Sequence, residues 1–246
     1  MRVRQTQRQH GILGTMNSSC LDAVIINPAA APRACIIWLH GLGADGHDFE
    51  PLIPQLDIVQ RYRVRVVLPH APTRAVTING GMQMPAWYDI KGTDFEARQD
   101  SAGLHESAQQ VQALIEREVH GGIPVGRIVL AGFSQGGAVV LHTGLRYPER
   151  LAGILALSTY LPLADRLAIE ASPANRDSPV WMAHGMQDPV VPVSLALQSR
   201  DRLLALGYPV AWHSYAMAHA VCPQEVRDIG LCLADWLRSL AADTSQ

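Results

Sequence analysis

The sequence predicts a single α/β domain with a mostly parallel central sheet and helices on both of its faces. Short, β-rich apolar runs alternate with longer segments whose apolar residues recur at helical spacing, which is the pattern of strand–helix–strand units. The chain has 246 residues, of which 48% are hydrophobic and 17% charged, so it can build one sizeable core. We expect this domain to span residues 19–246, preceded by a flexible tail over residues 1–18.

In the first half of the chain, apolar runs at residues 24–27, 34–39 and 63–68 are the expected strands. A helix is expected to begin at Asp100 or Ser101, because apolar residues then recur every three or four positions until Gly121 and Gly122. A strand at residues 127–131 and a helix at 135–146 follow. Residues 71–100 show no periodicity, and we expect a long loop there that forms one wall of a binding site.

The second half repeats this rhythm with strands at residues 153–157, 180–183 and 210–215. A helix is expected at residues 194–206, where Gly207 would end it. The last helix is expected at residues 223–240, with Pro223 in its first turn, where a missing backbone N–H is tolerated.

Composition excludes several classes of function. The net charge of −2 and the pI near 6.5 provide no broad basic surface for nucleic acid. No apolar run is long enough for stable membrane insertion. The arginines near the start precede no apolar signal region, and the four cysteines form no CxxC pair, so we expect a cytoplasmic protein.

The most informative motif is Gly132-Phe133-Ser134-Gln135-Gly136, a G-x-S-x-G sequence between an expected strand and an expected helix. This context is the one that a nucleophile elbow requires, in which small neighbours allow the serine to sit on a very tight turn. The following helix directs its N-terminal N–H groups toward developing negative charge. We interpret Ser134 as a nucleophile rather than as part of an ordinary glycine-rich turn.

A nucleophilic serine needs a base and an orienting carboxylate, which follow it in that fold in the order Ser, acid, His. Asp188 comes directly after a buried strand, and His219 follows the last strand, so both are expected at the same sheet edge as Ser134. The remaining histidines are better explained by packing or structural hydrogen bonds. Asp165 is a rival acid, but no turn motif supports it.

Two backbone N–H groups should bind the oxyanion that forms during acyl transfer: that of Gln135, directly after the nucleophile, and that of Leu42 in the early HGLG loop. The same loop contains His40, Asp45 and nearby acidic residues, but their spacing fits no metal-binding pattern, so no metal is expected. Three residues are candidates for substrate binding. They are Trp87, Tyr88 and Leu161, although packing over the core explains the two aromatic residues about equally well.

These motifs resemble those of the bacterial carboxylesterase and acyl-protein thioesterase family, also called the phospholipase/carboxylesterase family. The resemblance covers about residues 24–240 and rests on HGLGADGHDF, LPHAP, AWYDI, AGFSQGGA, LSTYLP, HGMQDPVVP and AHAV. It implies an α/β-hydrolase fold with little or no lid, with Ser134, Asp188 and His219 as catalytic residues and Leu42 and Gln135 as oxyanion donors. It also implies hydrolysis of short- to medium-chain acyl esters or thioesters, with acyl-protein thioesterase or lysophospholipase activity as the alternative.

The chain departs from the family pattern at two positions where many members have glycine, Thr159 and Ala218. An alanine before His219 would strain the loop if that position needed a positive φ, and we expect the loop to adapt. No cofactor is expected, the partner is a small acyl ester or thioester, and the protein is a monomer or homodimer. The rival readings are a peptidase or lipase, a metal-dependent hydrolase, and a non-catalytic α/β-hydrolase that binds a small ligand.

Overall fold

The computed structural model describes residues 21–92 and 99–242, and the tail predicted for residues 1–18 lies outside them. Over the described residues the main sheet has seven strands in the order β1-β3-β2-β6-β7-β8-β9. Their bounds are β1 Ala23–Ile26, β2 Ala34–Leu39, β3 Val64–Pro69, β6 Ile128–Phe133, β7 Gly153–Leu157, β8 Val180–Gly185 and β9 Val210–Tyr215. Strand β1 pairs antiparallel with β3, and every other pairing in this sheet is parallel. The predicted fold class, an α/β-hydrolase fold with a mostly parallel sheet, is confirmed.

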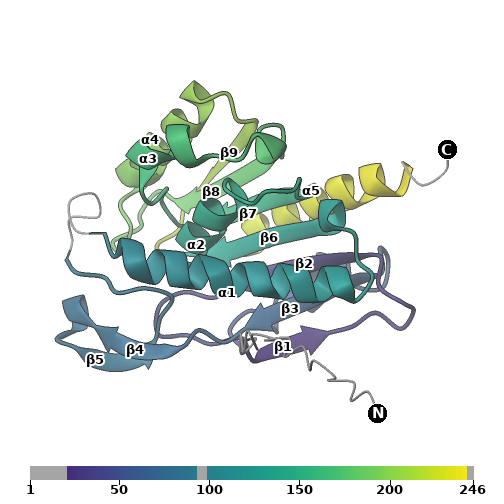
Figure 1. Cartoon of the computed structure of the whole chain (residues 1–246), viewed down its shortest axis with the longest axis horizontal. Helices are drawn as coiled ribbons and strands as arrows, with labels where there is room; N and C mark the ends of the chain where they lie inside the picture. Colours follow the sequence, from purple (N-terminus) through teal and green to yellow (C-terminus); the bar gives the residue numbers. More distant parts are fainter. Residues whose placement is uncertain (1–20, 93–98, 243–246) are drawn as a thin grey trace, which may run out of the picture.

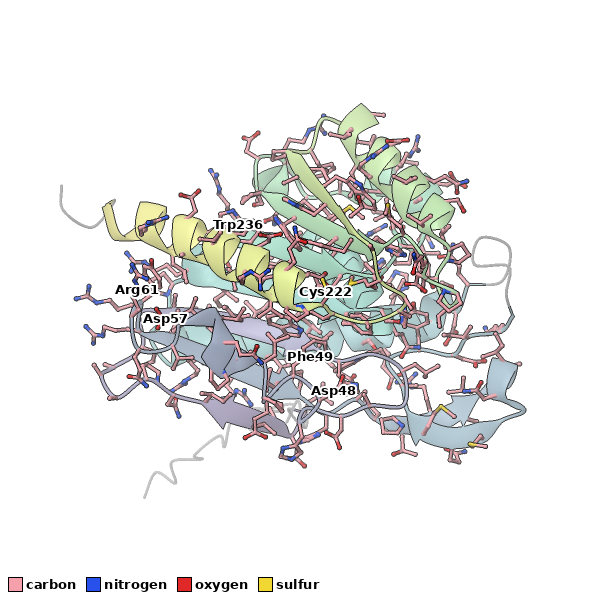
Figure 2. All side chains as sticks on the ribbon, turned by 180° about the vertical axis from the view of Figure 1, so that it is seen from behind. Asp48, Phe49, Asp57, Arg61, Cys222 and Trp236 are labelled. Carbon is pink, nitrogen blue, oxygen red and sulfur yellow. The ribbon has the colours of Figure 1, made fainter. Side chains whose placement is uncertain are left out.

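Helices cover both faces of this sheet (Figure 1). Their bounds are α1 Ser101–His120, α2 Gln135–Gly144, α3 Ala164–Glu170, α4 Val193–Ala205 and α5 Pro223–Ala242, with short 3-10 turns at Ile53–Leu56, Thr77–Asn79, Val125–Arg127 and Pro173–Asn175. Helices α1 to α4 share one buried cluster with alternate strand residues, whereas α5 and the first 3-10 turn share the other. Figure 2 looks onto the face that α5 covers.

Strand β2 shows why two cores form. All six of its residues are buried, and its side chains alternate between the two faces as a pleated strand requires. Cys35 and Ile37 belong to the core under α1 and α2, whereas Ile36 and Trp38 belong to the core under α5. A strand buried on both faces reads as a continuous apolar run, which is what the sequence contains here.

The expectation of a loop throughout residues 71–100 is wrong for its first half. Strands β4 Thr73–Val76 and β5 Met82–Pro85 pair antiparallel as a separate two-stranded sheet. Gly80 and Gly81 adopt positive φ at its turn, which glycine does without steric cost. In Figure 1 this hairpin projects at the lower left, beyond the N-terminal end of α1.

Helix α3 is a second element that the sequence pattern did not reveal. It has only seven residues and begins after Leu163, which has a left-handed φ of 49°. Such a short helix contains too few turns for a 3.6-residue period to appear. Over the described residues, no helix combines the length and apolarity needed to cross a membrane.

Candidate active site

Ser134 lies on the turn between β6 and α2, with φ 54° and ψ −119°. Its glycine neighbours are required by backbone contacts. A Cβ at Gly132 would lie 2.4 Å from the carbonyl oxygen of Gly136, and one at Gly136 would lie 2.5 Å from the carbonyl oxygen of His40. The side-chain hydroxyl of Thr159 donates to the Ser134 carbonyl oxygen at 2.7 Å. The turn is therefore held from both sides in an unusual conformation that presents Ser134 at the sheet edge.

The structure brings Ser134, His219 and Asp188 into one chain of hydrogen bonds. The Ser134 Oγ lies 2.9 Å from His219 Nε2, and His219 Nδ1 lies 2.7 Å from Asp188 Oδ2. The Asp188 side chain is fully buried, and its other oxygen accepts hydrogen bonds from the N–H groups of Val190 and Val191 at 2.8 and 2.9 Å. This arrangement can remove the serine proton and stabilise the imidazolium that results.

His184 also lies beside the acid. Its Nε2 is 2.9 Å from the carbonyl oxygen of Val191, to which it can only donate, and 3.4 Å from Asp188 Oδ2. Burial lowers the pKa of His184, so the ring is neutral near pH 7. A neutral donor here fixes the turn that carries Asp188 without placing a competing positive charge next to the carboxylate. Structural hydrogen bonding, the role expected for the histidines other than His219, is what His184 shows here.

The loop that carries His219 passes directly over the end of β8. A Cβ at Gly185 would lie 2.3 Å from the carbonyl oxygen of Ala218 and 2.4 Å from that of Met217, so this approach requires glycine. The Phe133 ring lies against the imidazole of His219, with ring centroids 4.8 Å apart. Ala218 does not have a positive φ. The strain considered for an alanine at this position is therefore absent.

The two expected oxyanion donors, Leu42 and Gln135, line the same cavity as Ser134. The Leu42 loop turns through Gly43, which has a φ of 77° and donates its N–H to the carbonyl oxygen of Pro85 at 2.9 Å. His40 fixes the start of the loop. Its Nδ1–H donates to the Gly41 carbonyl oxygen at 2.7 Å, and its Nε2 accepts the N–H of Ala71 at 3.0 Å.

Sequence reasoning assigned no site role to His40 or Thr159. His40 was considered only as a possible metal ligand, and Thr159 only as a departure from the family pattern. His40 directly follows β2 and Thr159 lies two residues after the end of β7, at the same sheet edge as Ser134. That position was the signal that could have identified them. Among the described residues, no group of three or more His, Cys, Asp or Glu side chains is arranged to hold a metal ion.

A cavity of about 590 Å³ opens at Ser134. Most of the side chains around it are apolar, and they come from the HGLG loop, the 3-10 turn of the β4–β5 hairpin, and the segment after Asp188. Its lining includes Leu42, Ile78, Ile90, Phe133, Pro189, Val190, Val191 and Pro192, together with Tyr88 and Tyr160. A cavity of this size and character suits an apolar chain attached to a reacting carbonyl.

Of the three expected substrate-binding residues, Tyr88 alone lines this cavity. Trp87 is fully buried behind it, where its indole N–H donates to the His40 carbonyl oxygen at 2.9 Å. Leu161 lines a second cavity. Trp87 and Leu161 thus lie outside the lining of this cavity, and their role in substrate binding stays a prediction.

The side chain of Gln135 explains why Trp87 is turned inward. Its Oε1 accepts the N–H of Trp87 at 2.8 Å, and its Nε2 donates to the carbonyl oxygen of Tyr88 at 2.7 Å. The amide thus ties this loop to the residue after the nucleophile. The rival acid Asp165 lies on α3 and lines the second cavity, away from His219.

Comparisons with known proteins find similar proteins over most of the chain. The phospholipase/carboxylesterase family model matches residues 21–237. Acyl-protein thioesterase 1 of Neurospora crassa is 39% identical over 232 residues, which cover 91% of this chain and 95% of that protein. Acyl-protein thioesterase 1 of Gibberella zeae is 38% identical over 223 residues, covering 87% and 95%. The crystal structure of Zea mays acyl-protein thioesterase 2 superposes with a TM-score of 0.78 at 30% identity, covering 88% of this chain and 99% of that one.

Proposed function

Because the chain belongs to the phospholipase/carboxylesterase family, and is thus an ester hydrolase of the serine carboxylesterase type, we propose that it cleaves acyl esters or thioesters through Ser134, His219 and Asp188. One observation carries the assignment of these residues. The three side chains form a continuous hydrogen-bonded chain, with contacts of 2.9 and 2.7 Å, that ends at the mouth of an apolar cavity.

In the first step, the Ser134 hydroxyl attacks the acyl carbonyl carbon while His219 Nε2 takes the hydroxyl proton. The carbonyl oxygen becomes an oxyanion, and the N–H groups of Leu42 and Gln135 stabilise it. One such donor contributes about 2.7–4 kcal/mol to the transition state. His219 then gives its proton to the departing alcohol or thiol, leaving the acyl group esterified to Ser134.

In the second step, His219 removes a proton from water, which attacks the acyl-enzyme carbonyl. The collapse of the second tetrahedral intermediate returns the proton to Ser134 Oγ and releases the carboxylic acid. Asp188 holds the imidazole in the required tautomer throughout. No cofactor or metal enters these steps.

The substrates we propose are short- to medium-chain acyl esters or thioesters. The apolar lining of the cavity supports an aliphatic acyl group, and the relatives named acyl-protein thioesterase favour S-acylated proteins as a second candidate. Lysophospholipids are the remaining alternative. Rates measured on a small acyl thioester and on an S-acylated peptide with the same acyl chain distinguish the first two candidates.

Replacing the nucleophile tests the proposal. We expect Ser134→Ala to lower kcat on a p-nitrophenyl acyl ester by about 10⁶-fold, as in a comparable triad. A fluorophosphonate probe should label the native protein and not this variant. Ser214→Ala, which changes an exposed serine of β9, is the matched control and should be labelled normally. Undiminished hydrolysis by Ser134→Ala would overturn the assignment.

We also propose that the enzyme works in the cytoplasm as a monomer or homodimer, on small acyl substrates and without nucleic acid. Cys35, Cys222 and Cys232 are free thiols among the described residues, which suits a reducing compartment. The slightly negative net charge supports a partner other than nucleic acid. Light scattering at several protein concentrations measures the oligomeric state.

A further inference from the structure

A second cavity, of about 380 Å³, lies beside the one that opens at Ser134. Residues from the segment after β7, from the start of α3 and from α4 surround it. Leu161, Leu163 and Leu195 contribute apolar surface, and Asp165, Arg166 and Arg202 contribute charge. Tyr160 belongs to the lining of both cavities. Its side chain therefore stands at the boundary between them.

Tyr160 is held at this boundary by a second tyrosine. The hydroxyl oxygens of Tyr88 and Tyr160 are 2.9 Å apart, and the two side chains are only 4% and 6% exposed. Burial raises the pKa of both hydroxyls, so each stays protonated and the hydrogen bond between them persists at neutral pH. The pair forms a rigid partition.

The partition is also fixed relative to the nucleophile. The Tyr88 carbonyl oxygen accepts from the side chain of Gln135, which directly follows Ser134. Thr159, directly before Tyr160, donates its hydroxyl proton to the Ser134 carbonyl oxygen. On the far side, the N–H of Leu161 donates to Ser199 Oγ on α4 at 2.8 Å. The distance from the reacting carbonyl to the partition therefore has little freedom to change.

We propose that the aromatic ring of Tyr160 sets the longest acyl chain that the enzyme accepts, by closing the cavity at Ser134 from the second cavity. This inference rests on the proposed function and deepens it. Removing the Tyr160 ring would join the two spaces and give the end of a longer chain access to Leu161, Leu163 and Leu195. Each further methylene buried there should raise kcat/KM by about fourfold.

The experiment measures kcat/KM for p-nitrophenyl esters from acetyl to palmitoyl. For Tyr160→Ala we expect the optimum to move to longer chains, with the ratio of long-chain to short-chain kcat/KM rising by about tenfold or more, because two or more methylenes gain burial. Tyr160→Phe keeps the ring and loses the hydroxyl, so it should keep the native optimum. If Tyr160→Ala does not fold, Tyr160→Leu, which also shortens the side chain, replaces it.

Filling the second cavity provides the matched control. Leu195→Trp alone should leave the chain-length profile unchanged, because Leu195 lines only the second cavity. Combined with Tyr160→Ala, it should restore the shorter optimum. An unchanged optimum in Tyr160→Ala would overturn the inference, and so would an equal shift in Tyr160→Phe. The native enzyme's hydrolysis of the acetyl ester tests the proposed function separately, since it does not depend on the partition.

Discussion

Gln135 combines two tasks in one residue. Its backbone N–H is a proposed oxyanion donor, while its buried side chain satisfies the N–H of Trp87 and the carbonyl oxygen of Tyr88. The second task fixes the wall of the cavity relative to the nucleophile. A mutation of Gln135 therefore acts on the site through the loop, because removing the side chain leaves the backbone donor in place.

We expect Gln135→Ala to lower the free energy of unfolding, because it leaves two buried backbone groups unpaired at about 1–3 kcal/mol each. Its kcat/KM should fall as the loop loosens, but far less than that of Ser134→Ala. Urea unfolding and ester hydrolysis measure the two effects. Gln55→Ala changes an exposed glutamine and should leave both near the native values. Native stability in Gln135→Ala would contradict the structural role of the amide.

At the level of the elements, the length and burial of each strand or helix decided whether the sequence could predict it. The strands at residues 34–39, 153–157 and 210–215 were predicted with the bounds that the structure gives, because buried runs and chain breakers mark both ends. The β4–β5 hairpin has two strands of four residues, mostly exposed or half-buried, and strands this short and this exposed give too weak a hydrophobic pattern to detect. The sequence could place the site residues that follow strands, because the carboxyl ends of parallel strands lie at the same edge of the sheet. The inward orientation of Trp87 depends on tertiary hydrogen bonds that no local pattern contains.

The His219 loop can pass close to the end of β8 because residue 185 is a glycine. Replacing this glycine tests whether the close contact positions His219. Gly185→Ala would place its Cβ 2.3 Å from the Ala218 carbonyl oxygen, so the loop must move away from Asp188. We expect kcat/KM to fall by about 10²-fold, the loss that a misplacement of about 1 Å can cause, and stability to fall by about 1–3 kcal/mol.

Gly126→Ala is the control for Gly185→Ala. The nearest heavy atom to a Cβ at Gly126 is the Arg150 carbonyl oxygen at 3.8 Å, an ordinary van der Waals contact, so this variant should keep native kinetics. Kinetics and urea unfolding of both variants decide the question. Native kcat/KM in Gly185→Ala would show that the loop tolerates displacement and that the contact does not position His219.

At the scale of the whole molecule, we expect one buried carboxyl group to make the free energy of unfolding depend on pH. Glu225 lies in the first turn of α5 and has no exposed surface. Burial is the main cause that raises the pKa of Glu225 to about 8; a backbone hydrogen bond from Cys222 opposes this rise, and the charge of Asp228 adds to it. Asp228 in turn accepts the Tyr215 hydroxyl proton at 2.8 Å, which links this helix to the end of β9.

The sign of the pH effect follows from which state holds the proton. In the unfolded chain Glu225 ionises near its ordinary pKa of 4.5, whereas the folded protein keeps the proton until about pH 8. The folded state thus binds more protons in this window, and the free energy of unfolding should fall as pH rises through it, by about 1.4 kcal/mol per pH unit at most. Glu225→Gln is neutral in both states, so its urea-unfolding free energy should lack this decline and exceed that of the native protein near pH 8. Glu116→Gln, at an exposed position on α1, should retain the native pH profile. If native and Glu225→Gln proteins lose stability in parallel between pH 5 and pH 8, another group must hold the proton, and the packing of α5 against the sheet cannot depend on a neutral Glu225.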